Sequence, residues 1–174
     1  LWMMGTKFVQ ERTGAGLFNC AFRSTKDIST KGGYLFAWIM DALMVGIGVG
    51  FDTKGAGTAT VRQPSFVDDV YVIDDSREGW VRSVRILLDG YYFGSDVPRF
   101  DYSAIRPLGA PIRGFGGTSA GHEPLMLLHN NLKELYDSRI GESVTSVDLV
   151  DTENLSGKCV VAGNVRRSAA LALG

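Results

Sequence analysis

The sequence contains little cysteine and no metal-binding spacing. Two cysteines occur among 174 residues, and Cys20 and Cys159 form neither a CxxC pair nor a Cys/His zinc pattern. This excludes a disulfide-stapled scaffold. Because the first residues also show no secretory signal, we expect a reducing cytoplasmic compartment, in which a functional disulfide is catalytic and transient.

The sequence also lacks an excess of charge of either sign. It lacks an uninterrupted apolar run long enough to span a membrane as well. The 18 basic and 19 acidic residues leave a net charge of −1, so there is no electrostatic footprint for DNA or RNA. The longest apolar run, residues 34–51, contains Asp41, which is costly in lipid, and glycines fill its second half. The run therefore predicts a buried helix over residues 34–45 and a glycine-rich strand over residues 46–51.

Both ends of the sequence look cut. The chain opens at Leu1-Trp2-Met3-Met4 and stops within an apolar stretch, Ala170 to Gly174. We therefore expect a segment of a longer polypeptide, forming a single partial domain over residues 1–174. Its hydrophobic content of 45% is enough for one domain-sized core.

Alternating strand and helix patterns predict an α/β fold with a partly parallel sheet. Short apolar runs predict strands, and apolar residues at three- and four-residue steps predict helices. Two capping boxes, Asp75 with Glu78 and Thr145 with Asp148, mark helix starts. The other predicted strands cover residues 17–22, 66–73, 93–99 (ended by Pro98) and 159–162, and the other predicted helices cover residues 77–88, a stretch from Pro124 closed by Gly141, and a short stretch after Thr145 closed by Gly157.

The glycines and the lone thiols are ambiguous when taken one at a time. Cys20 lies in an apolar run, where a packed small hydrophobe is the commoner interpretation of a free cysteine. The glycine-rich segment 114–121 precedes a helix, so a structural turn and a phosphate cradle are equally favoured. It is not a P-loop, because no Gly-Lys-Ser/Thr ending follows.

The charged pairs and the histidines also allow more than one interpretation. Arg166-Arg167 follows the predicted strand 159–162, and guanidinium groups suit phosphate or base edges, although a solvated basic pair is commoner. His122 and His129 are seven residues apart with no further ligand at metal spacing, so no metal site is predicted. The acidic pairs are interpreted as turn and cap residues rather than a catalytic acid pair; they are Asp68-Asp69 and Asp74-Asp75.

Five blocks of sequence together resemble one known family. They are Phe18-Asn19-Cys20-Ala21-Phe22, Gly48 through Gly55, Asp75 through Trp80, Ile105 through Gly121, and Gly157 through Ala169. Their content and order are similar to those of the adenosylcobalamin-dependent (class II, monomeric type) ribonucleoside-triphosphate reductases, and the similarity covers nearly the whole chain. A reductase class that uses diphosphates and a separate radical subunit is less consistent with the second and third blocks.

The resemblance implies a ten-stranded α/β barrel made of two five-stranded halves around a finger loop with a radical cysteine. This chain would supply part of the first half of the barrel and an inserted effector-binding region. In the monomeric relatives, that insertion imitates a dimer interface. Residues 51–102 are our candidate for part of it.

The resemblance also implies a chemistry, the thiyl-radical reduction of ribonucleoside triphosphates to deoxyribonucleoside triphosphates, which are DNA precursors. The implied cofactor is adenosylcobalamin, bound mostly outside this segment. Cys20 matches one of the two cysteines that reduce the 2′ position and become a disulfide, and Asn19 is the implied substrate-binding residue. Cys159 is expected to be structural and to lie on a strand. The radical and partner cysteines are missing, so the segment alone should be inactive.

Allosteric control is implied as well. Residues 163–168 resemble the loop that passes effector identity to the substrate site, with Asn164, Arg166 and Arg167 as candidates, and Asp27 resembles an acidic residue that binds the effector sugar. The implied partners are the triphosphate substrate, a deoxynucleoside triphosphate effector and a thioredoxin-type reductant, for a monomeric enzyme that binds neither nucleic acid nor membrane. The alternative is a non-catalytic nucleotide-sensing module derived from the same fold.

Overall fold

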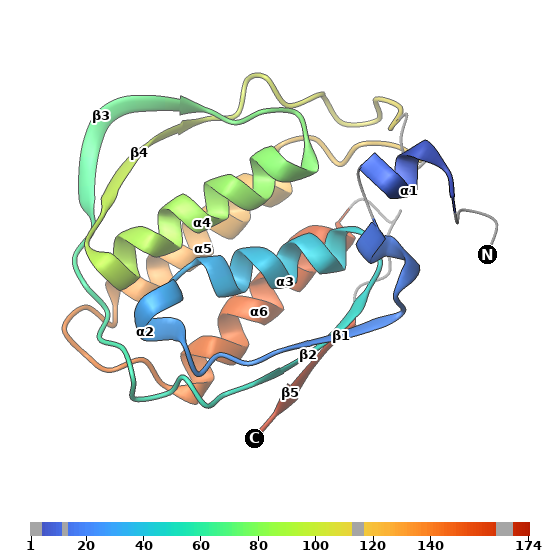
Figure 1. The fold of residues 1–174 in the computed structure, drawn as a ribbon. Coiled ribbons are helices and arrows are strands. Elements are labelled where there is room, and N and C mark those ends of the chain that lie inside the picture. The colour runs from blue at the N-terminus through green and yellow to red at the C-terminus, as the bar shows by residue number, and fades with distance from the viewer. Residues whose placement is uncertain (1–4, 12–13, 113–116, 163–168) are drawn as a thin grey trace.

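The structure, a computed structural model, describes residues 5–11, 14–112, 117–162 and 169–174 (Figure 1). A helical bundle lies against one face of a small sheet, and a two-stranded ribbon lies across the bundle from that sheet. In chain order the elements are α1 (Lys7–Glu11), η1 (Gly14–Leu17), β1 (Cys20–Arg23), α2 (Ile28–Lys31), α3 (Tyr34–Met44), β2 (Gly48–Asp52), β3 (Ser65–Val72), α4 (Arg77–Phe93), β4 (Asp96–Asp101), α5 (Glu123–Asp137), α6 (Ser146–Val161) and β5 (Ala170–Leu173).

The first sheet is parallel throughout, with strand order β1-β2-β5. Cys20 pairs with Gly48, and Val49 pairs with Ala170. Strands β3 and β4 form a second parallel pair, and α4 lies between them in the chain. Because parallel strands need crossover connections, usually helical, this arrangement confirms the predicted α/β class and its partly parallel sheet.

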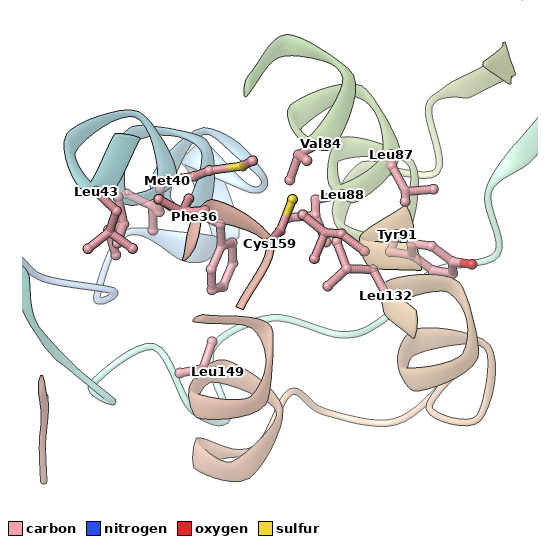
Figure 2. Packing of buried hydrophobic residues seen from close by; sticks show 14 of the residues in the cluster. Phe36, Met40, Leu43, Val84, Leu87, Leu88, Tyr91, Leu132, Leu149 and Cys159 are labelled. Atoms are coloured by element: carbon pink, nitrogen blue, oxygen red, sulfur yellow. The ribbon is translucent and has the colours of Figure 1, made fainter. Parts of the chain in front are cut away.

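Helix α3 forms the centre of the core. Eight of its eleven residues are buried, and it packs against α4, α6, β1 and β2. Figure 2 shows Phe36, Met40 and Leu43 of α3 among side chains from the neighbouring helices. The helix predicted over residues 34–45 and the strand predicted over residues 46–51 are both confirmed. In the parts of the chain that the structure describes, no helix has the length and apolar character to cross a membrane.

A chain of buried hydroxyl groups connects three helices of the bundle. The hydroxyls of Tyr92 on α4 and Tyr136 on α5 lie 2.6 Å apart, and Tyr136 lies 2.8 Å from Oγ1 of Thr152 on α6. Thr152 in turn donates to the Asp148 carbonyl at 2.7 Å. Because buried polar groups need partners, this chain helps to fix how α4, α5 and α6 pack.

The strand predicted at residues 159–162 is wrong, because α6 continues through Gly157 to Val161. The capping box at its start is confirmed: Thr145 accepts from the Asp148 N–H, and the Asp148 carboxylate accepts from the Thr145 N–H. A helical glycine costs only about 1 kcal/mol, which burial of one helix face outweighs. The buried positions recur at three- and four-residue steps: Leu149, Thr152, Glu153, Ser156, Cys159 and Val160.

The start and the end of α4 both differ from the prediction. Ser76 caps the helix, since its Oγ accepts from the Gly79 N–H at 3.0 Å. Asp75, predicted as the cap, instead pairs with Arg106 at 2.7 Å. The helix continues to Phe93 rather than ending at residue 88, because its last turns still bury side chains against the bundle.

Pro98 lies inside β4 instead of ending it. The ladder pairs Val97 with Phe66 and Arg99 with Val70, with a register shift between the two pairs. Pro98 therefore sits where the ladder is irregular and no N–H is required.

Two turn predictions are also wrong. Asp68 and Asp69 are exposed residues within β3 rather than turn residues. Helix α5 ends at Asp137, before Gly141, which forms a separate turn with a φ of +86°.

Gly33, at the N-terminal end of α3, lies close to the backbone of α4. A Cβ atom at this position would lie 2.7 Å from the Leu88 Cβ and 2.8 Å from the Arg85 carbonyl oxygen. Gly33→Ala should lower the free energy of unfolding by about 1–3 kcal/mol, because backbone atoms of α4 would have to move. Urea unfolding followed by circular dichroism measures this loss. Gly48→Ala is the control, since its Cβ would meet no atom closer than 3.7 Å, and equal midpoints for the two variants would contradict the close approach.

Candidate functional site

Cys20 begins β1 and faces away from the helices. Side chains alternate along the strands, so Val49 and Phe51 are buried against the bundle while Cys20 and Phe22 are exposed on the other face. The residue paired with Cys20 is Gly48, which has no side chain to fill the space beside the thiol. A ligand can therefore approach the Cys20 sulfur closely.

The face that carries Cys20 is apolar and uncovered. The exposed fractions of Phe22, Leu171 and Leu173 are 54%, 63% and 46%. Within the described ranges, the outer edge of β1 pairs with no other strand. Exposed apolar side chains beside an unpaired edge are typical of a surface that other protein segments cover.

Asn19 lies at the same end of the sheet as Cys20. It directly precedes β1 and is exposed, and its carbonyl accepts a hydrogen bond from the Gly48 N–H at 3.0 Å. The predicted substrate-binding residue and the predicted catalytic thiol are therefore adjacent at the start of two parallel strands.

The residue that follows the predicted specificity loop lies beside this part of the sheet. Ala169, which follows it, accepts a hydrogen bond from the Val49 N–H at 2.8 Å. The segment before the loop is helix α6, not the predicted strand. The candidate residues themselves lie outside the described residues; they are Asn164, Arg166 and Arg167.

Asp27 lies at the other end of the sheet. It precedes α2 beyond the C-terminal end of β1, and its carboxylate pairs with Lys31 at 3.2 Å. Ala169 adjoins the first residues of β2, whereas Asp27 follows the last residues of β1. The structure therefore does not bring Asp27 together with the flank of the specificity loop.

Asp52 joins the C-terminal ends of β1 and β2. Its carboxylate accepts from the Ser24 hydroxyl at 2.8 Å, the Thr25 N–H at 2.8 Å and the Lys54 N–H at 3.3 Å. Burial opposes the charged form, but these hydrogen bonds outweigh it and lower the pKa of Asp52. The Thr25 hydroxyl donates to the Asp52 carbonyl and accepts from the Gly55 N–H, both at 2.9 Å. No sequence spacing indicates this cluster, which forms only when the strands pair.

A groove of about 660 Å³ runs between α3 and α4. Tyr34 and Trp38, one turn apart on α3, line it, and the Arg23 guanidinium lies 5.4 Å from both ring centroids. The Arg85 guanidinium lies 5.3 Å from the Tyr34 ring. Aromatic rings suit a nucleobase, but carboxylates also line the groove and already pair with its arginines: Arg77 with Asp41 and Glu78, and Arg85 with Asp89. Sequence reasoning missed this groove because its residues come from two separate helices, and the four-residue spacing of Tyr34 and Trp38 was the only signal.

The glycine-rich segment 114–121 is described from Gly117 onward. Ser119 accepts a hydrogen bond from the Gly121 N–H at 3.0 Å. Arg106 donates to the Pro111 carbonyl at 3.1 Å and to the Asp75 carboxylate at 2.7 Å, which ties the residues before this segment to the region before α4. The described part is a hydrogen-bonded turn.

His129 takes part in a buried hydrogen-bond relay. The Ser83 hydroxyl donates to the Trp80 carbonyl at 2.8 Å, so we assign the proton of His129 to Nε2, which donates to Ser83 at 3.1 Å while Nδ1 accepts from the Tyr102 hydroxyl at 2.7 Å. Burial, with a smaller effect of Lys133, lowers the pKa of His129 to about 3. Among the described residues, no three His, Cys, Asp or Glu side chains are grouped to hold a metal ion.

Cys159 has an environment opposite to that of Cys20. It lies on α6 in the same buried cluster as Phe36 and Leu88 (Figure 2). Burial raises the pKa of its thiol to about 12, so the thiol stays protonated and unreactive at neutral pH.

Comparison with known proteins gives consistent matches. The family model described as "B12-dependent ribonucleotide reductase, insertion domain" matches residues 53–136. The probable adenosylcobalamin-dependent ribonucleoside-triphosphate reductase of Dictyostelium discoideum is 44% identical, covering 92% of this chain and 23% of that protein. The Euglena gracilis enzyme is 41% identical over 100% of this chain and 24% of its own length. The Lactobacillus leichmannii enzyme is 34% identical over 100% of this chain and 31% of its own length.

A solved structure agrees with these sequence matches. The crystal structure of a B12-dependent (class II) ribonucleotide reductase superposes with a TM-score of 0.74 at 28% identity, covering 97% of this chain and 31% of that one. The parallel α/β fold is thus that of a ribonucleotide reductase segment. The chain belongs to the family of adenosylcobalamin-dependent, class II ribonucleoside-triphosphate reductases, and it spans between 23% and 31% of the length of these relatives.

The two thiols should differ sharply in reactivity. Because Cys20 is exposed and Cys159 is buried, N-ethylmaleimide should label Cys20 in the native protein and Cys159 only after unfolding. Mass spectrometry of the digested protein locates the label. Fast labelling of native Cys20→Ser would show that Cys159 is accessible and would contradict the packing of α6.

His129 should make the protein less stable in acid. The unfolded histidine takes up a proton near pH 6.5, whereas the folded one does so only near pH 3. Stability from neutral His129 is therefore complete above pH 6.5 and is lost as the pH falls toward 3. Between these values the wild type should lose about 1.4 kcal/mol per pH unit more than His129→Gln. Urea unfolding across this range measures the slopes, with exposed His122→Gln as the control; equal slopes for His129→Gln and the wild type would rule out this titration.

Proposed function

We propose that this chain carries one of the two thiols with which a ribonucleoside-triphosphate reductase reduces the ribose 2′ position, and that Cys20 is this thiol. The observation that carries the proposal is the exposure of Cys20 on the uncovered face of the sheet, opposite Gly48. Cys159 is unsuited to the role because it is buried in the helical bundle.

In the proposed reaction, Cys20 gives up one electron and one proton. A partner thiol from elsewhere in the protein gives the same, so the two sulfurs join as a disulfide while the 2′ hydroxyl leaves as water and hydrogen takes its place. The two sulfurs must come within about 2 Å to bond, and the absence of a side chain at Gly48 keeps that space open. We propose that Asn19, next to Cys20, contacts the substrate. A thioredoxin-type reductant would then restore the thiols, and the product would serve as a DNA precursor.

We propose that the contacts to adenosylcobalamin lie mostly outside this chain. Of its two histidines, His129 already uses both ring nitrogens within the bundle, and His122 lies at the start of α5. When bound, adenosylcobalamin supplies the initiating radical in this family. We propose that other parts of the protein hold the cofactor. None of the steps assigned to Cys20 depends on where the cofactor binds.

We propose that β1, β2 and β5 belong to the first half of the ten-stranded barrel. Their parallel order and the unpaired edge of β1 support this, because a further strand can add there. The uncovered apolar face would then line the barrel interior, which places Cys20 where the substrate ribose must lie.

We propose that a deoxynucleoside triphosphate regulates the reaction through the insertion, which includes residues 51–102. Helices α4 and α5 both fall almost entirely within the matched residues 53–136 and close the bundle around α3. Asp27 remains the proposed contact for the effector sugar. The specificity loop remains the proposed route to the substrate, through Asn164, Arg166 and Arg167. Because Asp27 lies at the far end of β1 from this loop, an effector bound there must act through the structure between them.

The test is nucleoside triphosphate reduction by the full-length monomeric parent, with adenosylcobalamin and a dithiol, in the presence and absence of deoxynucleoside triphosphate. Cys20→Ser should form no deoxynucleotide above background while keeping the wild-type circular dichroism spectrum. Cys159→Ala, which changes the other thiol, should retain turnover. Full turnover by Cys20→Ser would overturn the proposal, and a parent that binds effector but reduces nothing would favour a sensing module.

A further inference from the structure

We propose that Asp52 is a positioning residue that joins the exit of β1 to the first turn of the insertion and thereby couples effector binding to the strand that carries Cys20. This inference rests on the proposed function. It concerns a residue of the sheet that contacts neither thiol, so Asp52 acts through the segments that it holds.

Three segments meet at Asp52. The first is the exit of β1, where Ser24 and Thr25 donate to the carboxylate at 2.8 Å. The second is β2, of which Asp52 is the last residue. The third is the start of the matched insertion at residue 53, where Lys54 donates to the same carboxylate at 3.3 Å. One side chain therefore holds the barrel strand and the inserted region at a single point.

The junction is built to be rigid. Thr25 is fully buried and Asp52 is 5% exposed, and hydrogen bonds to a charged acceptor are stronger than those between neutral groups. Gly55 closes the junction from the insertion side, because a Cβ there would lie within 3 Å of the Thr25 carbonyl. We therefore expect the exit of β1 and the turn at Gly55 to move as one rigid unit.

The location of the junction gives it a role in coupling. Asp27 follows Thr25 by two residues, so the proposed effector contact is attached directly to the junction around Asp52. Cys20 lies at the other end of the same short strand, which is hydrogen-bonded to β2 along its length. A shift of Thr25 is therefore passed along β1 to Cys20 and, through β2, to the flank of the specificity loop at Ala169.

The test uses the full-length parent with Asp52→Asn, which keeps the size of the side chain but removes its charge. We expect effector-free turnover per folded enzyme to stay within about twofold of wild type, while the effector-induced change in preference between two triphosphate substrates falls about fivefold or more, the lower end of typical allosteric couplings. Hydrogen exchange gives a second readout. Effector should slow exchange of residues 24–28 and 53–57 together in wild type but not in the variant.

Two further variants keep the test decisive. Ser24→Ala removes one hydrogen bond without touching the carboxylate and should give a smaller loss of the same kind, which covers the case in which Asp52→Asn does not fold. Asp151→Asn, the same substitution on α6 outside the matched residues 53–136, should leave the effector response unchanged. An unchanged effector response in Asp52→Asn, or equal losses of turnover and of response per folded enzyme, would overturn the coupling role. Failure of the proposed function is separate, because Cys20→Ser would then keep full turnover, whatever the effector response of Asp52→Asn.

Discussion

Helix α3 has almost no polar face, and most of the architecture follows from this constraint. A helix of this kind is stable in water only when other elements surround it. The sheet covers one side of α3, while α4 and α6 cover the others. Since α4 belongs to the region matched by the insertion-domain model, the insertion is part of the core that α3 requires. Removing it would uncover Phe36, which is fully buried and stacks on Tyr92 of α4.

The sequence predicted the first half of the fold well because its signals there are local. The apolar run around Asp41 predicted both α3 and β2, and the alternation of elements predicted the α/β class. The identity of the family came from blocks in a fixed order rather than from any single motif. Cys20 alone favours a packed hydrophobe, and only its block suggested a catalytic thiol. That role is still a proposal, although its exposed position suits it.

The errors arose where tertiary contacts decide the structure. Gly157 indicates a helix end, and the β-branched pair Val160-Val161 favours a strand locally, yet burial of α6 keeps all three helical. The cap of α4 moved by one residue because Asp75 is engaged by Arg106, which is 31 residues away. The cluster around Asp52 and the groove at Tyr34 were not predictable, because each combines residues from separate elements. The separation of Asp27 from the specificity loop likewise follows from strand direction, which residue spacing does not encode.

The two cysteine thiols differ in exposure because of where they lie relative to the sheet. Helices cover only one face of the β1-β2-β5 sheet, so a thiol on α6 is buried and a thiol at the start of β1 is open. The open face is apolar, and no described segment of this chain covers it, so it needs the rest of the protein to become a site. Under the proposed function, an exposed thiol that meets its partner only when the surrounding protein is present suits radical chemistry, in which a partner thiol must be in place before the substrate is attacked. The same arrangement is consistent with a coupling role for Asp52: the reacting sulfur needs open space beside it, so an effector signal must reach it from the other end of the strand.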